Sequence, residues 1–110
     1  MSKAQIKTRR RSLRMWINIP VRASGKDADG KDFSEDTQTI VVNAHGGLLF
    51  LQRPVKVGTD FLLTNRDTKE EQPCRVVTLR GPLTDKGIDV GIELLLPSPH
   101  FWGVDFPADY

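Results

Sequence analysis

Short stretches in which apolar and polar residues alternate, separated by turn-forming residues, recur along most of this chain. In the first of them, at 15–21, apolar side chains occupy every second position. A period of two places these side chains on one face of a β-strand, whereas an amphipathic helix requires a period of 3.6. No long amphipathic segment separates the stretches, which favours an antiparallel barrel or sandwich over a parallel α/β sheet.

The same patterns predict about six strands in all. After the first stretch, further strands are expected at residues 37–42, 48–51, 61–63, 72–80 and 88–94. Asp29 and Gly30 indicate a hairpin, because glycine tolerates the positive φ that such a turn requires. Pro20 indicates that the first strand lies at an edge or carries a bulge, and Gly81 with Pro82 is expected to end the strand at 72–80.

The C-terminal part has a different character. Ser98 and Pro99 are suitable as the N-cap and first position of a short helical turn over 100–102. Three aromatic residues are then expected to fold back onto the barrel: Phe101, Trp102 and Phe106.

The charges are distributed unevenly along the chain. Six of the 16 basic residues lie in 1–14, and none of the 14 acidic residues does, so the remainder is mildly acidic. We interpret 1–14 as a flexible basic N-terminal arm and 15–110 as one barrel domain. A basic arm on an acidic body suits the capture of an anion, such as a phosphate-bearing ligand, although a solvated tail has the same composition.

The chain is expected to act in the cytoplasm and to have no membrane span. The first residues are basic and polar with no apolar segment after them, which is unlike a signal peptide. The longest apolar stretches, at 48–51 and 92–96, are far too short to cross a bilayer. Cys74 is the single cysteine, so an internal disulfide is excluded, and we interpret it as a small buried apolar residue.

Two motifs carry a family resemblance. Arg9, Arg10 and Arg14 have the spacing RRxxxR just before the first strand, and Asn43 opens the segment Asn-Ala-His-Gly-Gly after the second. This arrangement resembles the PilZ family, whose domains show an RRxxxR arm and a later (D/N)xSxxG motif. The resemblance covers nearly the whole chain and implies an all-β, six-stranded antiparallel PilZ-type β-barrel at 15–110 with a short C-terminal helical turn.

Many PilZ domains are receptors for the bacterial second messenger cyclic di-GMP, so the resemblance implies this ligand. A guanidinium group matches both a phosphate and the O6/N7 edge of guanine with paired hydrogen bonds. The resemblance places Arg9, Arg10 and Arg14 in the arginine motif. It places Asn43 where its amide hydrogen-bonds guanine or orients an arginine. Signalling would then pass to an effector protein that the sequence does not identify.

The second motif departs from the family pattern at two positions. His45 stands where serine is usual, and its imidazole either contacts the guanine or fills the groove. Leu48 stands where the final glycine is usual. Gly46 and Gly47 directly precede it and would supply positive φ or close backbone approach if the turn is shifted. His45, Gly46 and Gly47 therefore join the ligand-binding candidates.

Two alternatives to a receptor remain open. One is a PilZ-like protein interaction module that binds no nucleotide, for example in motility or surface-structure assembly. The other is nonspecific nucleic-acid binding through the basic arm, with Trp16 as a stacking platform. The acidic balance of 15–110 argues against nucleic acid as a partner.

Catalysis and metal binding find little support in the sequence. It contains no nucleophile elbow, no phosphate-binding glycine loop followed by a helix, and no paired catalytic carboxylates. His45 and His100 lack an accompanying carboxylate or thiolate pattern, so neither a metal nor a cofactor is expected. We therefore expect a binding protein and no enzyme.

Overall fold

The computed structural model describes residues 14–98, 100–104 and 106. Within them the chain forms seven strands and no helix. The strands are β1 (Met15–Trp16), β2 (Pro20–Lys26), β3 (Asp32–Asn43), β4 (Gly46–Leu51), β5 (Asp60–Asn65), β6 (Glu71–Thr84) and β7 (Gly87–Leu94).

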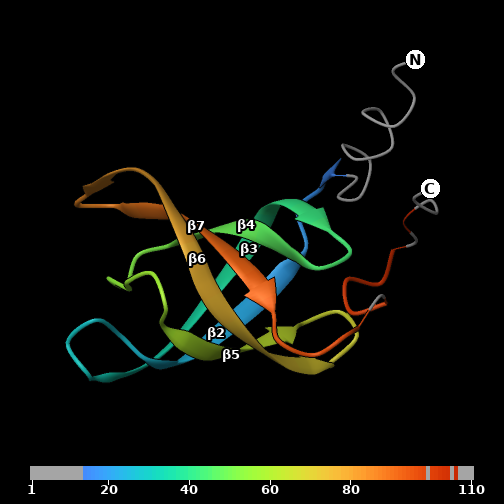
Figure 1. Ribbon diagram of the computed structural model, residues 1–110, viewed down its shortest axis with the longest axis horizontal. Coiled ribbons are helices and arrows are strands. Elements are labelled where there is room, and N and C mark those ends of the chain that lie inside the picture. The colour runs from blue at the N-terminus through green and yellow to red at the C-terminus, as the bar shows by residue number, and fades with distance from the viewer. Residues whose placement is uncertain (1–13, 99, 105, 107–110) are drawn as a thin grey trace, which may run out of the picture.

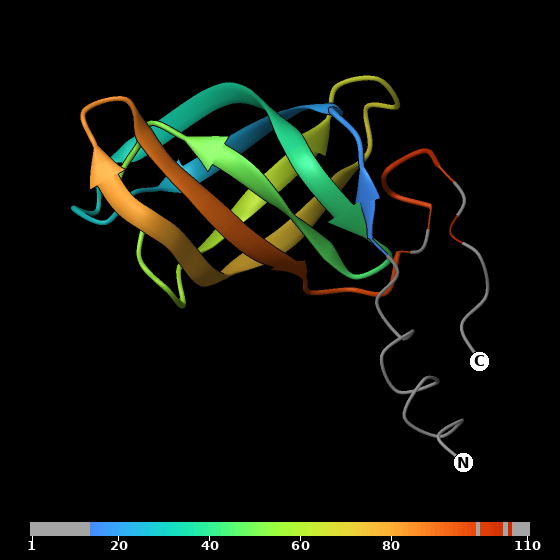
Figure 2. The same ribbon diagram turned by 90° about the horizontal axis from the view of Figure 1, so that it is seen from above.

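Six of these strands close into an antiparallel barrel. Their order is β3-β2-β5-β6-β7-β4, and the pairing of β4 with β3 completes the ring. The extra strand, β1, pairs with the end of β3. Figures 1 and 2 show β1 and the segment that follows β7 at the same end of the barrel, with the β2–β3 hairpin at the opposite end. The predicted all-β, six-stranded antiparallel barrel is confirmed.

The core fills the interior of this ring with alternate side chains from its strands. In β7, Ile88, Val90 and Ile92 are all buried, as the period of two predicts. Phe101 and Trp102 are 1% and 2% exposed and join the same cluster, so the chain after β7 packs onto the barrel as expected. Partly buried Phe106 also packs against the cluster.

The first expected strand is divided in two. Between β1 and β2, the Thr39 hydroxyl donates to the carbonyl of Ile17 at 2.7 Å and accepts from the N–H of Ile19 at 2.8 Å. The Thr39 side chain, on β3, thus replaces regular main-chain hydrogen bonds between strands over 17–19. Pro20, which has no N–H to donate, begins β2. β2 pairs with both β3 and β5, so Pro20 does not stand in an edge strand, and the irregularity is a break between β1 and β2.

The expected end of a strand at Gly81 and Pro82 is wrong. β6 continues through both residues to Thr84. Gly81 takes a φ of 81°, and the pairing with β7 shifts register between Arg80 and Thr84. A breaker sequence here produces a bulge inside a long strand.

The predicted C-terminal helical turn is also wrong for the residues that are described. The N–H of Phe101 donates to the carbonyl of Ser98, and the N–H of Gly103 donates to that of His100, each at 3.0 Å, which makes two separate turns. The side-chain amide of Asn65 donates to the Phe101 carbonyl at 2.8 Å. That carbonyl is therefore held by the barrel and not by a helical hydrogen bond.

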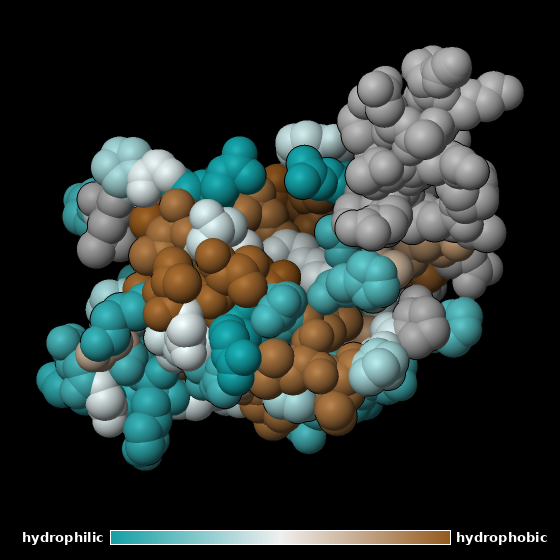
Figure 3. Space-filling view, in the orientation of Figure 1, coloured by the Kyte–Doolittle hydropathy of each residue, from teal (hydrophilic) through white to brown (hydrophobic). Residues whose placement is uncertain are grey.

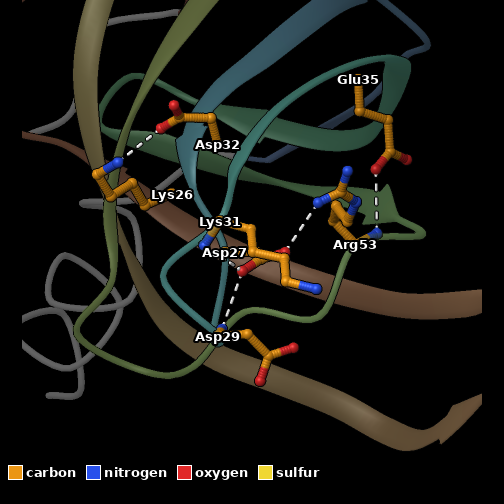
Figure 4. Close-up of polar contacts among 7 residues, drawn as sticks. All are labelled: Lys26, Asp27, Asp29, Lys31, Asp32, Glu35 and Arg53. Carbon is orange, nitrogen blue, oxygen red and sulfur yellow. Dashed lines mark hydrogen bonds and ion pairs between the residues drawn. The ribbon is translucent and has the colours of Figure 1, made fainter.

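An acidic cluster holds the β2–β3 hairpin to the loop after β4 (Figure 4). The Asp27 carboxylate accepts hydrogen bonds from the main-chain N–H groups of Asp29 and Lys31 and from Nη1 of Arg53, at 2.9, 3.0 and 2.8 Å. Glu35 accepts from the main-chain N–H of Arg53 at 3.1 Å. The Lys31 hydrogen bond, and after it the Arg53 bond, hold the pKa of Asp27 below its ordinary value against the opposing effect of burial.

Candidate functional site

A hollow of about 270 Å³ lies on the outside of the barrel, across five neighbouring strands. These strands lie in the order β1, β3, β4, β7 and β6. Three of the ligand-binding candidates from the sequence line this hollow: Arg14, Asn43 and Gly47. Residues of β1, at one end of the barrel, are thus brought together with residues of β6, which are distant in sequence.

The floor of the hollow is a single row of cross-strand partners. Trp16 pairs with Val41, Val41 with Leu48, Leu48 with Gly91, and Gly91 with Thr78. Val41, Leu48 and Gly91 each adjoin a buried core residue, so alternation along the strand directs this row outward. The hollow therefore has a largely apolar floor, in which the methyl group of Thr78 covers buried Gly91.

Two arginines supply the positive charge of the hollow, Arg14 before β1 and Arg80 on β6. Neither forms an ion pair within residues 14–98, 100–104 and 106. The four other arginines in this part of the chain each pair with an aspartate: Arg22, Arg53, Arg66 and Arg75. The two arginines without an acidic partner are thus the two that face the hollow, which favours an anionic ligand.

Asn43 closes the turn between β3 and β4. Its side-chain Oδ1 accepts the N–H of His45 at 2.8 Å, and its main-chain carbonyl accepts Nε1 of Trp102 at 2.8 Å. The amide nitrogen Nδ2 makes no hydrogen bond to any described residue. Asn43 therefore shapes the turn with its oxygens and has a donor left for a ligand.

The two glycines after this turn allow backbones to approach closely. A Cβ on Gly46 would lie 2.1 Å from the carbonyl oxygen of Ile92, and one on Gly47 would lie 2.8 Å from that of Val41. Neither glycine adopts a positive φ. Gly46 is buried against β7, so only Gly47 of the pair borders the hollow.

His45 lies apart from this hollow. Its side chain is exposed and borders a second hollow, of about 240 Å³, together with Ala44 and residues 94–98. Leu48, the other departure from the motif pattern, lies in the floor of the first hollow. The remaining candidates, Arg9 and Arg10, lie outside the described residues.

Sequence reasoning missed Arg80 and gave Trp16 only a secondary role. Trp16 is 80% exposed, far more than the buried Trp102. Val77, which also lines the hollow, is an exposed apolar residue at 45%. Figure 3 shows apolar surface gathered over β6 and β7, interrupted by hydrophilic patches.

The residues that the structure describes also include one cysteine and other side chains that are potential metal ligands. Cys74 is fully buried, and the loss of water around its sulfur raises the pKa of the thiol, so its reactive thiolate form is disfavoured. In the part of the chain that the structure describes, no group of three or more His, Cys, Asp or Glu side chains is placed to hold a metal ion. The same residues include no helix with the length and apolar character needed to cross a membrane.

No protein-family model matches the sequence, and no curated protein matches it either. Function is therefore inferred from the residues of the chain itself.

Proposed function

We propose that this chain is a PilZ-like receptor for cyclic di-GMP, acting in the cytoplasm of a bacterium, and that the ligand binds in the hollow across β1, β3, β4, β7 and β6. One observation carries the proposal. Arg14, the last arginine of the first motif, and Asn43, the first residue of the second, line the same hollow although they are far apart in sequence.

The chemistry of the hollow suits this ligand. Cyclic di-GMP presents two phosphates and two flat guanine rings. Arg14 matches a phosphate or the O6/N7 edge of guanine, and the Nδ2 group of Asn43 is a donor for an acceptor on the base. The apolar floor formed by Val41 and Leu48 accommodates a flat ring. Arg10 precedes Arg14 by four residues, a span of about 13 Å when extended, so it can reach a ligand held there.

Binding would signal by changing the arm. A ligand held jointly by Arg9, Arg10 and Arg14 and by the barrel binds most tightly when 1–14 lies against the hollow. Ligand therefore shifts the population toward that arrangement, by as much as its affinity differs between the two. An effector protein then distinguishes the bound surface from the free one.

Titration calorimetry with cyclic di-GMP tests the proposal directly. The full chain is expected to bind saturably, and the double variant Arg10→Ala/Arg14→Ala is expected to lose binding. The matched control is Arg66→Ala/Arg75→Ala, which removes the same charge from exposed arginines outside the hollow. No binding by the unaltered chain, or equal loss in both double variants, would overturn the site.

A protein interaction module is the second candidate, and the exposed apolar residues favour it. Trp16 and Val77 present apolar surface around the hollow, and Leu48 occupies the floor where the family pattern has glycine. Such a surface also suits a protein partner. The titration separates the two candidates. If the chain is an interaction module that binds no nucleotide, adding cyclic di-GMP at high concentration should release no binding heat and leave the melting temperature unchanged.

A further inference from the structure

We infer that Trp16 and Arg80, which lie outside both sequence motifs, are ligand-binding residues: Trp16 stacks on a base, and Arg80 binds a phosphate from the opposite wall of the hollow. The inference rests on the proposed function and adds to it the way in which the ligand is held.

The position of Trp16 suits stacking. It follows Arg14 by two residues, so along an extended chain both side chains lie on the same face. Its side chain is 80% exposed, whereas Phe101 and Trp102 are almost fully buried. An indole that contributes so little to the core is available for the flat face of a base, which aromatic side chains bind well.

The floor beside Trp16 is shaped for a planar ring. The row of outward-facing partners continues from Val41 and Leu48 to Gly91, which is buried beside Thr78. A Cβ at Gly91 would lie 2.4 Å from Cγ2 of Thr78, so the Thr78 methyl group packs over Gly91 and continues the apolar floor. A base that stacks on Trp16 can therefore lie over this apolar strip.

Arg80 provides the charge on the other side. Asp89 is its direct cross-strand partner, yet no ion pair joins the two side chains. Arg75, on the same strand, pairs with Asp60 through two contacts of 2.7 and 3.1 Å. Arg14 and Arg80 thus border the floor from opposite sides, and a ligand with two phosphates can offer one to each arginine.

Tryptophan fluorescence and calorimetry with cyclic di-GMP test this arrangement in the full chain. Ligand is expected to quench the long-wavelength emission of exposed Trp16 and to leave the emission of buried Trp102 unchanged. Trp16→Ala is expected to raise Kd about tenfold or more, and Trp16→Phe, which keeps an aromatic face, to raise it less than about threefold.

Arg80→Ala is expected to raise Kd about tenfold, because a charge-assisted hydrogen bond is lost. Arg75→Ala is the control for removing one positive charge from β6, and its Kd should stay close to that of the unaltered chain. Circular dichroism melting confirms that each variant is folded.

The outcomes separate this inference from the proposed function. If the unaltered chain binds cyclic di-GMP but Trp16→Ala and Arg80→Ala bind equally well, the receptor proposal stands and this inference is wrong. If the unaltered chain binds none, both are wrong. If Arg75→Ala weakens binding as much as Arg80→Ala, the effect comes from net charge in general, and the specific contact inferred for Arg80 is wrong.

Discussion

The indole Nε1 of Trp102 donates a hydrogen bond to the main-chain carbonyl oxygen of Asn43, with 2.8 Å between the two atoms. This bond joins the segment after β7 to the end of β3, where the hollow begins. The side chain of Asn65 holds the neighbouring Phe101 carbonyl at 2.8 Å, so the segment is attached at two successive residues. The turn that carries Asn43 is thereby fixed from outside its own hairpin.

Trp102→Phe tests this attachment. The change removes the indole donor and leaves the Asn43 carbonyl without that partner, so we expect the free energy of unfolding to fall by about 2 kcal/mol. Denaturant titration measures the loss. Trp16→Phe is the control, and its exposed position predicts a change below about 0.5 kcal/mol. Equal stability of the two variants would contradict the role of the bond.

Gly46→Ala tests whether this glycine is needed for packing of the backbone. Its Cβ would lie 2.1 Å from the Ile92 carbonyl oxygen, so β4 and β7 must separate, and we expect a loss of about 4 kcal/mol or more. The control is Gly58→Ala, where the Cβ meets nothing within 4 Å but φ is 92°, which predicts a smaller cost of about 1–3 kcal/mol. A Gly46→Ala variant that melts above Gly58→Ala would be contrary to this interpretation.

These residues show how far the sequence predicts the structure. The period of two in apolar residues predicted β7 and the buried face that includes Ile19. It could do so because this pattern depends only on residues that are close together in sequence. The strand end predicted at Gly81 and Pro82 was wrong, because a strand that is paired to a neighbour tolerates a bulge where the local sequence suggests an end. Phe101 formed no helix, since the barrel supplies Asn65 as a partner for its carbonyl.

The site was less predictable than the strands. Arg14 and Asn43, which line the hollow, were proposed from their motifs, but nothing near Arg80 in sequence distinguishes it from other arginines. Its place at the hollow depends on closure of the barrel, which brings β6 beside β7 and β7 beside β4. Likewise, the contact between Gly91 and Thr78 arises from strand register, which single-sequence periodicity does not specify.

The Asp27 cluster predicts how stability depends on pH. Its hydrogen bonds from Lys31 and Arg53 lower the pKa of Asp27 in the folded chain, so the ionised carboxylate stabilises the fold above the unfolded value of about 3.9. That stabilisation is lost as pH falls through the lower, folded pKa. Asp27→Asn is expected to reduce the melting temperature at pH 7 and to show a smaller further decrease on acidification.

Melting curves between pH 7 and 3 measure this effect. Asp29→Asn makes the same change of charge in the same turn, at an exposed residue, and should retain the full acid dependence of the unaltered chain. The Asp27 interpretation fails if Asp27→Asn loses as many degrees on acidification as the unaltered chain does.

His45→Ser tests one of the two departures from the motif pattern, His45, without changing the other, Leu48. The His45 side chain borders the second hollow, with residues 94–98, whereas Leu48 lies in the floor of the first. The hydrogen bond from His45 to Asn43 uses the main-chain N–H, which serine keeps. We therefore expect His45→Ser to change the Kd for cyclic di-GMP by less than about threefold, below the effect of one good hydrogen bond.

Asn43→Ala is the comparison for that titration. It removes both the acceptor that shapes the turn and the Nδ2 donor that faces no described partner, so a rise in Kd of about tenfold is expected. Tighter binding by His45→Ser would show that the imidazole obstructs the ligand, and weaker binding would show that it is a contact. Either result would extend the binding surface from the first hollow around the turn to the second, because His45 borders only the latter.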